Sequence, residues 1–176
     1  MKDIYIFRGS PASGKGTITE AFLKEIDGKT AFLELDTFRW GFHLINRIVP
    51  DVTEDEHELA YKNYLAVLEN YLSSGSYTIV TEGLFSWSSE SPHGCIQDVL
   101  QLCKRYDYNA HPILLYAEYE TLWQRNLSRD YSVPEEEFKS LYEHVMTERS
   151  DEELSINVGK NSIEQTVSEL SSLLSN

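Results

Sequence analysis

Cysteine, proline and basic residues are all scarce in this chain. Its 176 residues include only two cysteines and five prolines. Cys95 and Cys103 fall on a segment that reads as one helix, where their separation along the axis is about 12 Å at the helical rise. That distance exceeds the reach of a disulfide, and the spacing matches no zinc site. We therefore expect two free thiols in a reducing compartment.

Positive charge and long apolar runs are also missing. The chain has 15 basic and 29 acidic residues, a formal net charge of −14, whereas binding of long nucleic acid needs clustered Lys and Arg. No stretch approaches the roughly 18 apolar residues of a membrane span, and the apolar run near Met1 is too short for a signal peptide. We expect a cytoplasmic protein that has no membrane partner and does not bind long nucleic acid. The oligomeric state is left open.

Apolar runs that alternate with helical patterns indicate an α/β fold. At about 150 residues per domain, the length predicts one domain over residues 1–176. The alternation is typical of a parallel sheet covered on both faces, which is a three-layer α/β/α arrangement. The longest predicted helix begins with a capping box at Thr53–Glu56, ends at Gly75 and includes Leu59 and Leu68 in its apolar face. The pattern predicts strands over 4–7, 30–35, 77–81, 111–117 and 154–158, and helices over 18–26, 37–48, 53–75, 95–105, 119–130, from 134 onward and over 162–174.

A glycine-rich motif follows the first predicted strand. The segment Gly9–Thr17 reads GSPASGKGT and fits the phosphate-binding pattern G-x-x-x-x-G-K, known as a P-loop. Its glycines allow the backbone to turn tightly and to present N–H groups inward, and the following helix N-terminus adds further donors for phosphate oxygens. Lys15 reaches the β- and γ-phosphates as a point charge. We expect nucleotide contacts from Gly9, Ser10, Ala12, Ser13, Gly14, Lys15, Gly16 and Thr17.

One position departs from the general P-loop pattern. The residue after Lys15 is Gly16 rather than Ser or Thr, and the hydroxyl comes one position later at Thr17. This Gly-Lys-Gly-Thr ending resembles adenylate kinases and their small-kinase relatives more than GTPases or large ATPases. In that group Mg²⁺ is held largely through water and the substrate phosphates. The resemblance implies ATP and Mg²⁺ as cofactors, and a phosphate contact rather than a metal bond for Thr17.

A carboxylate and a guanidinium follow the second predicted strand. Asp36 stands at its carboxyl end and Arg39 lies about one helical turn further on, where open α/β sheets bind ligands. Asp36 can accept the proton of an acceptor hydroxyl, and Arg39 can hold an anionic acceptor. The alternatives are that Asp36 only caps a helix and that Arg39 is a solvated charge.

The spacing Asp-x-x-Arg behind this P-loop looks like the kinase domain of polynucleotide kinases. It is also similar to zeta-toxin kinases, in which a histidine follows a few residues later, here His43, and to chloramphenicol phosphotransferases. The resemblance implies that Asp36 is the general base and that the strands of the parallel sheet are ordered 2-3-1-4-5. It runs over nearly the whole chain and is weak between residues 40 and 75.

An acidic residue ends the third predicted strand. Glu82 follows the run Ile79–Thr81, at the position where P-loop proteins place an acid near Mg²⁺. We expect Glu82 to line the acceptor side and to hold Mg²⁺, directly or through water. The alternative is a strand-end acid in solvent.

Two arginines follow the fourth predicted strand. Arg125 and Arg129 are four residues apart on the predicted helix, so they face the same way. In adenylate-kinase-like folds a pair with this spacing begins a short lid, here about residues 125–134. The resemblance implies that Arg125 lies against the nucleotide base and that Arg129 meets the transferring phosphate. The alternative is a pair of solvated arginines beside acidic neighbours.

These motifs predict an ATP-dependent kinase that transfers the γ-phosphoryl group to a hydroxyl of a small molecule, with Lys15, Asp36 and Arg129 as catalytic residues. One alternative is a kinase of nucleic-acid 5′ ends or of a nucleotide sugar. Another is a slow NTPase that acts as a nucleotide-dependent switch. A switch needs no acceptor base, so Asp36 and Arg39 count against it. The identity of the acceptor and the choice between ATP and GTP are left open.

Overall fold

The computed structural model describes residues 2–41, 53–88, 91 and 93–174. In chain order these residues form β1 (Lys2–Arg8), α1 (Lys15–Leu23), β2 (Thr30–Glu34), α2 (Leu35–Trp40), α3 (Glu54–Ser74), β3 (Thr78–Gly83), α4 (Ile96–Arg105), β4 (Tyr108–Tyr116), α5 (Tyr119–Leu127), α6 (Glu135–Thr147), β5 (Leu154–Asn157) and α7 (Ile163–Leu174).

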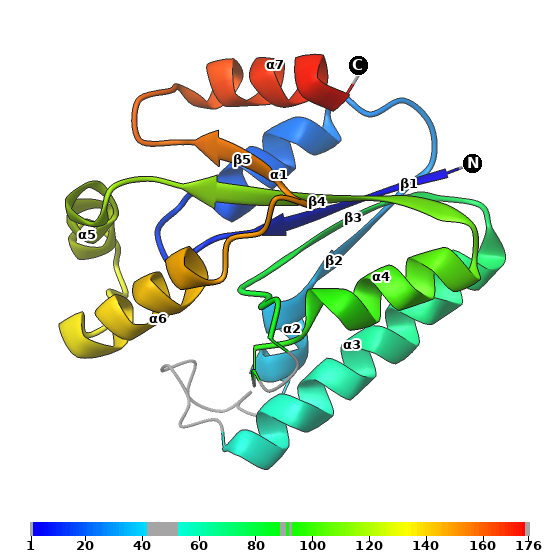
Figure 1. The fold of residues 1–176 in the computed structure, drawn as a ribbon, viewed down its shortest axis with the longest axis horizontal. Coiled ribbons are helices and arrows are strands. Elements are labelled where there is room, and N and C mark those ends of the chain that lie inside the picture. The colour runs from blue at the N-terminus through cyan, green and yellow to red at the C-terminus, as the bar shows by residue number, and fades with distance from the viewer. Residues whose placement is uncertain (1, 42–52, 89–90, 92, 175–176) are drawn as a thin grey trace.

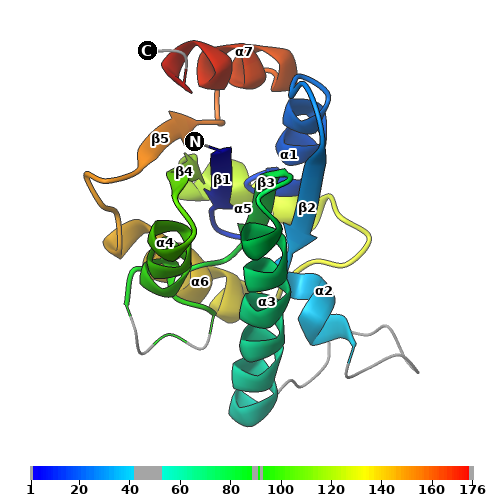
Figure 2. The same cartoon turned by 90° about the vertical axis from the view of Figure 1, so that its right-hand side faces the viewer.

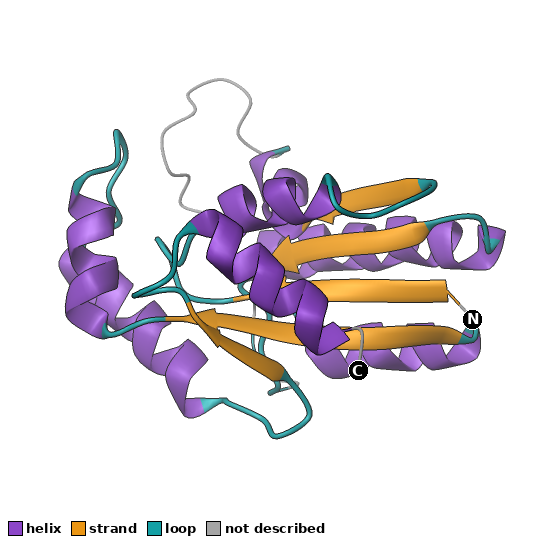
Figure 3. Ribbon diagram, turned by 90° about the horizontal axis from the view of Figure 1, so that it is seen from above, coloured by secondary structure: helices purple, strands orange, loops and turns teal. Residues whose placement is uncertain are grey.

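The strands form one parallel sheet in the order β2-β3-β1-β4-β5, which confirms the predicted order. The register aligns Phe7 of β1 with Glu82 of β3, and Glu34 of β2 with the same Glu82. Figure 3 shows that the arrowheads of the strands point to one end of the sheet. The residues that follow β1, β2 and β3 therefore meet at that end.

Helices cover both faces of the sheet, so the three-layer prediction is confirmed. Helices α1 and α7 pack together on one face, and α3 and α4 on the other, while α5 and α6 lie beyond the carboxyl ends of β4 and β1 (Figures 1 and 2). The buried apolar residues gather in two main clusters. One, on the α3 and α4 side, includes Tyr64, Leu68 and Ile79; the other, on the α1 and α7 side, includes Phe7 and Phe22.

Most predicted boundaries agree with the structure to within a few residues. The capping box of α3 is present, with Thr53 Oγ1 accepting from Glu56 N, and Gly75 ends the helix with φ 59°. Leu59 was expected in the apolar face of α3, but its side chain lies on the outer face and is 48% exposed. The helix predicted over 37–48 is present as α2, Leu35–Trp40, and the rest of that prediction, with His43, lies outside the described residues. Both cysteines are free and buried, as expected.

The described helices include none that is long and apolar enough to cross a membrane.

A fully buried arginine ends β1, directly before the P-loop. Arg8 Nη1 lies 3.0 Å from Glu153 Oε2 and 3.1 Å from Glu153 Oε1, and both side chains are 0% exposed. The same guanidinium donates to the carbonyls of Phe85 (3.0 Å), Val145 (3.1 Å) and Glu148 (3.3 Å). A buried charge is tolerated only when it is paired and hydrogen-bonded, and these contacts meet that requirement.

The acids around Arg8 also hold the loop that follows β3. Glu153 accepts from Trp87 Nε1 at 3.3 Å and from the backbone N–H of Ser150 at 3.1 Å. Glu148 accepts from Ser86 Oγ and from the backbone N–H of Trp87. The end of β1, the loop after β3 and the segment between α6 and β5 are therefore joined in one hydrogen-bonded network.

We expect Glu153→Gln to lower the free energy of unfolding by about 3–5 kcal/mol, because it leaves the Arg8 charge buried without a counter-charge. Urea denaturation measures this loss. The double variant Arg8→Met/Glu153→Leu should recover much of it, because neither charge remains. The control is Glu20→Gln, whose carboxylate pairs with Lys24 on the surface and should matter little. An unchanged midpoint for Glu153→Gln would contradict the prediction.

Candidate active site

The P-loop crosses the carboxyl ends of the central strands and leads into α1. At Gly9 a Cβ atom would stand 2.4 Å from the carbonyl oxygen of Leu115, so no side chain fits there. Gly14 has φ 81° and caps α1, and its carbonyl accepts from Ile18 N at 2.9 Å. The backbone N–H groups of the first turn of α1 have no helical partners. This arrangement provides donors and a positive dipole end for an anion.

Lys15 lies over the loop that precedes it. Its Nζ donates to the carbonyl oxygens of Gly9 at 2.7 Å and Ser10 at 3.2 Å. Burial lowers the pKa of Lys15, while the charges of Asp36 and Glu82 oppose that shift. A phosphate placed against Nζ would favour the charged ammonium, because an opposite charge stabilises the ionised form.

The charges that act on Lys15 come from four separate segments. They are Asp36 in α2, Glu82 in β3, Arg129 after α5 and Glu34 at the end of β2. The sequence predicted the first three as site residues. Glu34 was not predicted; its place as the last residue of the strand beside β3 is the signal that would have found it.

Glu82 is 6% exposed, and its Oε2 has no hydrogen-bond partner among the described residues. Its Oε1 lies near the P-loop, because a Cβ built on Gly16 would stand 3.5 Å from it. Burial raises the pKa of Glu82, and the Thr19 hydroxyl and the Lys15 charge work in the opposite direction. The alternative of a solvated strand-end acid is therefore wrong.

One buried carboxylate suits Mg²⁺, which proteins usually bind through one or two carboxylates, substrate phosphates and water. The described residues include no cluster of three or more His, Cys, Asp or Glu side chains that could hold a metal alone. Glu82 therefore fits a metal whose other ligands come from nucleotide and water.

Asp36 and Arg39 form an ion pair at the edge of this group. Arg39 Nη1 lies 2.6 Å from Asp36 Oδ1, and the Arg39 side chain is only 10% exposed, so it is not a solvated charge. Asp36 does not cap α2 either: the cap residue is Glu34, and Asp36 lies in the first turn. The Asp36 side chain is 43% exposed, so the carboxylate is accessible to an incoming group.

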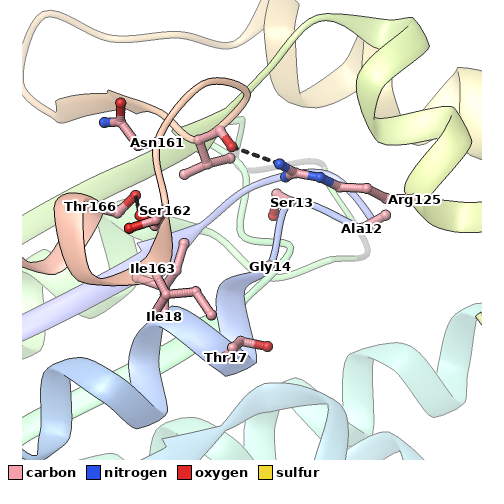
Figure 4. Close-up of a pocket in the computed structure, with 11 residues that line it drawn as sticks. Ala12, Ser13, Gly14, Thr17, Ile18, Arg125, Asn161, Ser162, Ile163 and Thr166 are labelled. Carbon is pink, nitrogen blue, oxygen red and sulfur yellow. Dashed lines mark hydrogen bonds between the residues drawn. The ribbon is translucent and has the colours of Figure 1, made fainter.

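A pocket of about 200 Å³ lies between the P-loop and the N-terminus of α7 (Figure 4). Arg125 forms part of its wall, held by a 2.8 Å bond from Nη2 to the carbonyl of Val158. The lining residues are Ala12, Ser13, Gly14, Thr17, Ile18, Arg125, Val158, Asn161, Ser162, Ile163 and Thr166. Arg125 follows β4, on one side of β1 in the sheet, whereas Asp36 and Arg39 follow β2, on the other side.

Arg129 does not lie on the same helix as Arg125. Helix α5 ends at Leu127, because the buried Asn126 side chain binds the next segment: its Nδ2 donates to Val133 O at 2.8 Å and its Oδ1 accepts from Val133 N at 2.9 Å. Arg129 is exposed in the turn between them. The two arginines therefore lie in different regions: Arg125 lines the pocket, and the charge of Arg129 acts on Lys15.

Two histidines lie near Arg39, and one of them, His57, was not predicted from sequence as a site residue. His57 comes from α3 and His93 from the loop before α4; burial lowers the pKa of both, and the Arg39 charge adds to that effect. They are far apart in the chain and match no motif, so only the fold brings them to this site.

No family model matches the chain. A curated relative, the L-seryl-tRNA(Sec) kinase of Methanococcus maripaludis, is 26% identical over 148 residues, which are 82% of this chain and 52% of that protein. The chain thus spans about half the length of this relative.

Solved structures cover the chain almost completely. The shikimate kinase of Aquifex aeolicus has a TM-score of 0.62 at 17% identity, covering 98% of this chain and 96% of that one. A sugar kinase from Janibacter sp. has a TM-score of 0.64 at 18% identity, with coverage of 99% and 95%. A gluconokinase from Sinorhizobium meliloti has a TM-score of 0.62 at 15% identity, with coverage of 99% and 95%. The arrangement of its sheet, helices and glycine-rich loop gives this chain the fold of the P-loop kinases.

Proposed function

We propose that this protein transfers the γ-phosphoryl group of ATP to a hydroxyl of a small molecule. The observation that carries the proposal is that the charges of Asp36, Glu82 and Arg129 all act on Lys15 of the P-loop. A protein that only binds nucleotide needs no carboxylate open to a second substrate. The likeness to kinases in fold and in sequence supports the same reading.

In this proposal residues 1–176 act as one kinase domain. The P-loop residues Gly9–Thr17 and the N-terminus of α1 bind the phosphates of ATP. The pocket beside Arg125 takes the base, because it is the described cavity that adjoins the loop. The turn after α5, with the flanking residues of about 125–134, acts as a short lid that brings Arg129 to the phosphates.

The chemical step needs a base and positive charge at the transferring group. Asp36 takes the proton of the acceptor hydroxyl while the oxygen of that hydroxyl forms a bond to the γ-phosphorus. The bond from that phosphorus to the β–γ bridging oxygen breaks, which releases ADP. Lys15 and Arg129 stabilise the charge on the phosphoryl oxygens. Mg²⁺ would be held by Glu82, directly or through water, and would neutralise phosphate charge when bound.

An acceptor carried on tRNA is the second candidate, because the curated relative is named as an L-seryl-tRNA(Sec) kinase. The net charge of −14 counts against a large nucleic-acid partner for this chain. ADP release measured with and without a metabolite library separates a small-molecule kinase from both this candidate and a slow nucleotide switch.

Lys15→Ala should abolish phosphoryl transfer and weaken ATP binding while the thermal midpoint stays close to the wild-type value, because the Nζ atom contacts loop carbonyls rather than the apolar core. Calorimetry with ATP and a transfer assay check this. Lys24→Ala at the exposed end of α1 is the control. Normal turnover in Lys15→Ala would refute the P-loop assignment.

Asp36→Asn should lower kcat by roughly 10²–10⁴, the usual range for loss of a general base, with little change in ATP affinity. Single-turnover transfer and calorimetry measure the two quantities. If ATP affinity falls while the rate per bound ATP holds, Asp36 serves the metal or the fold instead.

Arg129→Ala should reduce kcat far more than it changes the Kd for ATP, because a residue delivered by a closing lid acts mainly near the transition state. Arg125→Ala should instead weaken ATP binding, since Arg125 lines the pocket. Both variants are compared by calorimetry and single-turnover transfer. Equal small effects of both substitutions on both quantities would show two ordinary surface charges.

A further inference from the structure

Three histidines stand in a row beside Asp36 and Arg39. The ring centroids of His57 and His93 are 5.9 Å apart, and those of His93 and His144 are 5.8 Å apart, each pair edge to face. They come from α3, the loop before α4, and α6 respectively. The row is not a metal centre, because the described residues contain no metal-binding cluster of this kind.

Arg39 presents one edge of its guanidinium without a partner. Nη1 is used in the ion pair with Asp36, whereas Nε and Nη2 are buried and have no hydrogen bond to any described residue. Nε and Nη2 together form the planar edge that binds a carboxylate or phosphate through two parallel hydrogen bonds. His57 Nδ1 is also buried and lacks a partner among the described residues. Buried donors that lack hydrogen bonds are costly. We therefore expect a ligand with hydrogen-bond acceptors to bind at this group of atoms.

The inner histidines are uncharged near neutral pH. Burial, together with the charges of Arg39, His144 and His57, lowers the pKa of His93 to about 4, while Asp36 acts in the opposite direction. Burial also lowers the pKa of His57, and Arg39 adds to that effect while Asp36 and Glu56 oppose it.

The outer histidine is held in place by its neighbours. His144 Nδ1 lies 3.6 Å from Glu148 Oε1, and its Nε2 lies 3.4 Å from Ser91 Oγ. Glu148 belongs to the network around Arg8. His144 therefore serves as a fixed support for the His93 ring rather than as an open ligand.

We propose that the free edge of Arg39, together with His57 and His93, binds an oxyanion group of the acceptor, a phosphate or a carboxylate, while the acceptor hydroxyl lies at Asp36. That the bound anion belongs to the acceptor rests on the function proposed above, whereas the existence of the anion subsite does not. The substrate class is then a hydroxyl compound that also carries an anionic group.

Proton uptake follows from this arrangement. An anion beside His57 and His93 favours their charged forms, so anion binding raises the pKa of these rings. At a pH between the pKa of the free protein and that of the complex, each affected ring takes up a proton on binding. The affinity for the anion therefore rises as the pH falls, by up to about tenfold per pH unit for each proton taken up.

Calorimetry of the whole chain tests the subsite. The P-loop is first saturated with a non-hydrolysable ATP analogue and Mg²⁺, and sulfate is then titrated because its charge is constant over the pH range used. Repeating the titration in buffers of different ionisation enthalpy gives the number of protons taken up. We expect saturable sulfate binding with net proton uptake and loss of that binding in Arg39→Gln. Binding without proton uptake, or no binding to the loaded protein, would overturn the proposal.

Histidine ring NMR locates the protons. Added sulfate should raise the titration midpoints of His57 and His93, whereas His111, which pairs with Asp3 in the first part of β4, is the internal control and should not respond. His93→Gln should reduce the proton uptake and His111→Gln should leave it unchanged. Equal responses of all the rings, or none, would indicate non-specific ion binding and count against the subsite.

The same experiment separates this proposal from the proposed function. Failure of the ATP analogue to bind, or transfer to no hydroxyl compound, would defeat the kinase assignment but would leave sulfate binding at Arg39 intact. Normal binding of the analogue with no sulfate site would defeat the subsite alone. Competition of phosphate and of acetate against sulfate then identifies which oxyanion the acceptor carries.

Discussion

Arg8 is charged, fully buried and adjacent in sequence to the P-loop, so its partners fix where that loop begins. Its bonds to Glu153 and to the carbonyls of Phe85, Val145 and Glu148 join β1 to the loop after β3 and to the end of α6. A buried arginine that loses these partners is strongly destabilising. The segments that supply them are therefore held in fixed positions relative to one another. The acceptor side of the site is thereby tied to the nucleotide side.

The charges of the site come together because neighbouring parallel strands end at the same edge of the sheet. The charges of Glu34, Asp36 and Glu82 act on Lys15 because β3 ends beside β1 and β2 ends beside β3. This acidic setting opposes the lowering of the Lys15 pKa by burial, but it also repels a polyphosphate. Arg129 and a bound cation would offset that repulsion. The excess of acidic residues in the whole chain thus has a local counterpart around Lys15.

The spacing of apolar residues and the residue types found at turns made much of this fold predictable. The P-loop, the parallel sheet and the capped α3 follow from local patterns, and the strand order from a family resemblance. The end of α5 was not predictable, because it depends on Asn126 binding Val133 across the turn. The histidine row was equally hidden, since His57 and His93 become neighbours only after α3 packs beside the loop before α4. The charge of Arg8 at the end of an apolar strand was visible in the sequence, but its partner Glu153 is 145 residues away.

Asn126 mimics a strand neighbour for Val133, bonding both its N–H and its C=O, and so closes the turn that contains Arg129 into a small ring. Within this ring the backbone between α5 and α6 has little freedom left to lose. Conformational entropy is the main cost of ordering a mobile loop over a ligand, and loop closure costs less when the loop is short. If this turn closes over a bound phosphate, as proposed, it would therefore move as a unit that is already shaped, because the cost of ordering its backbone has been met during folding.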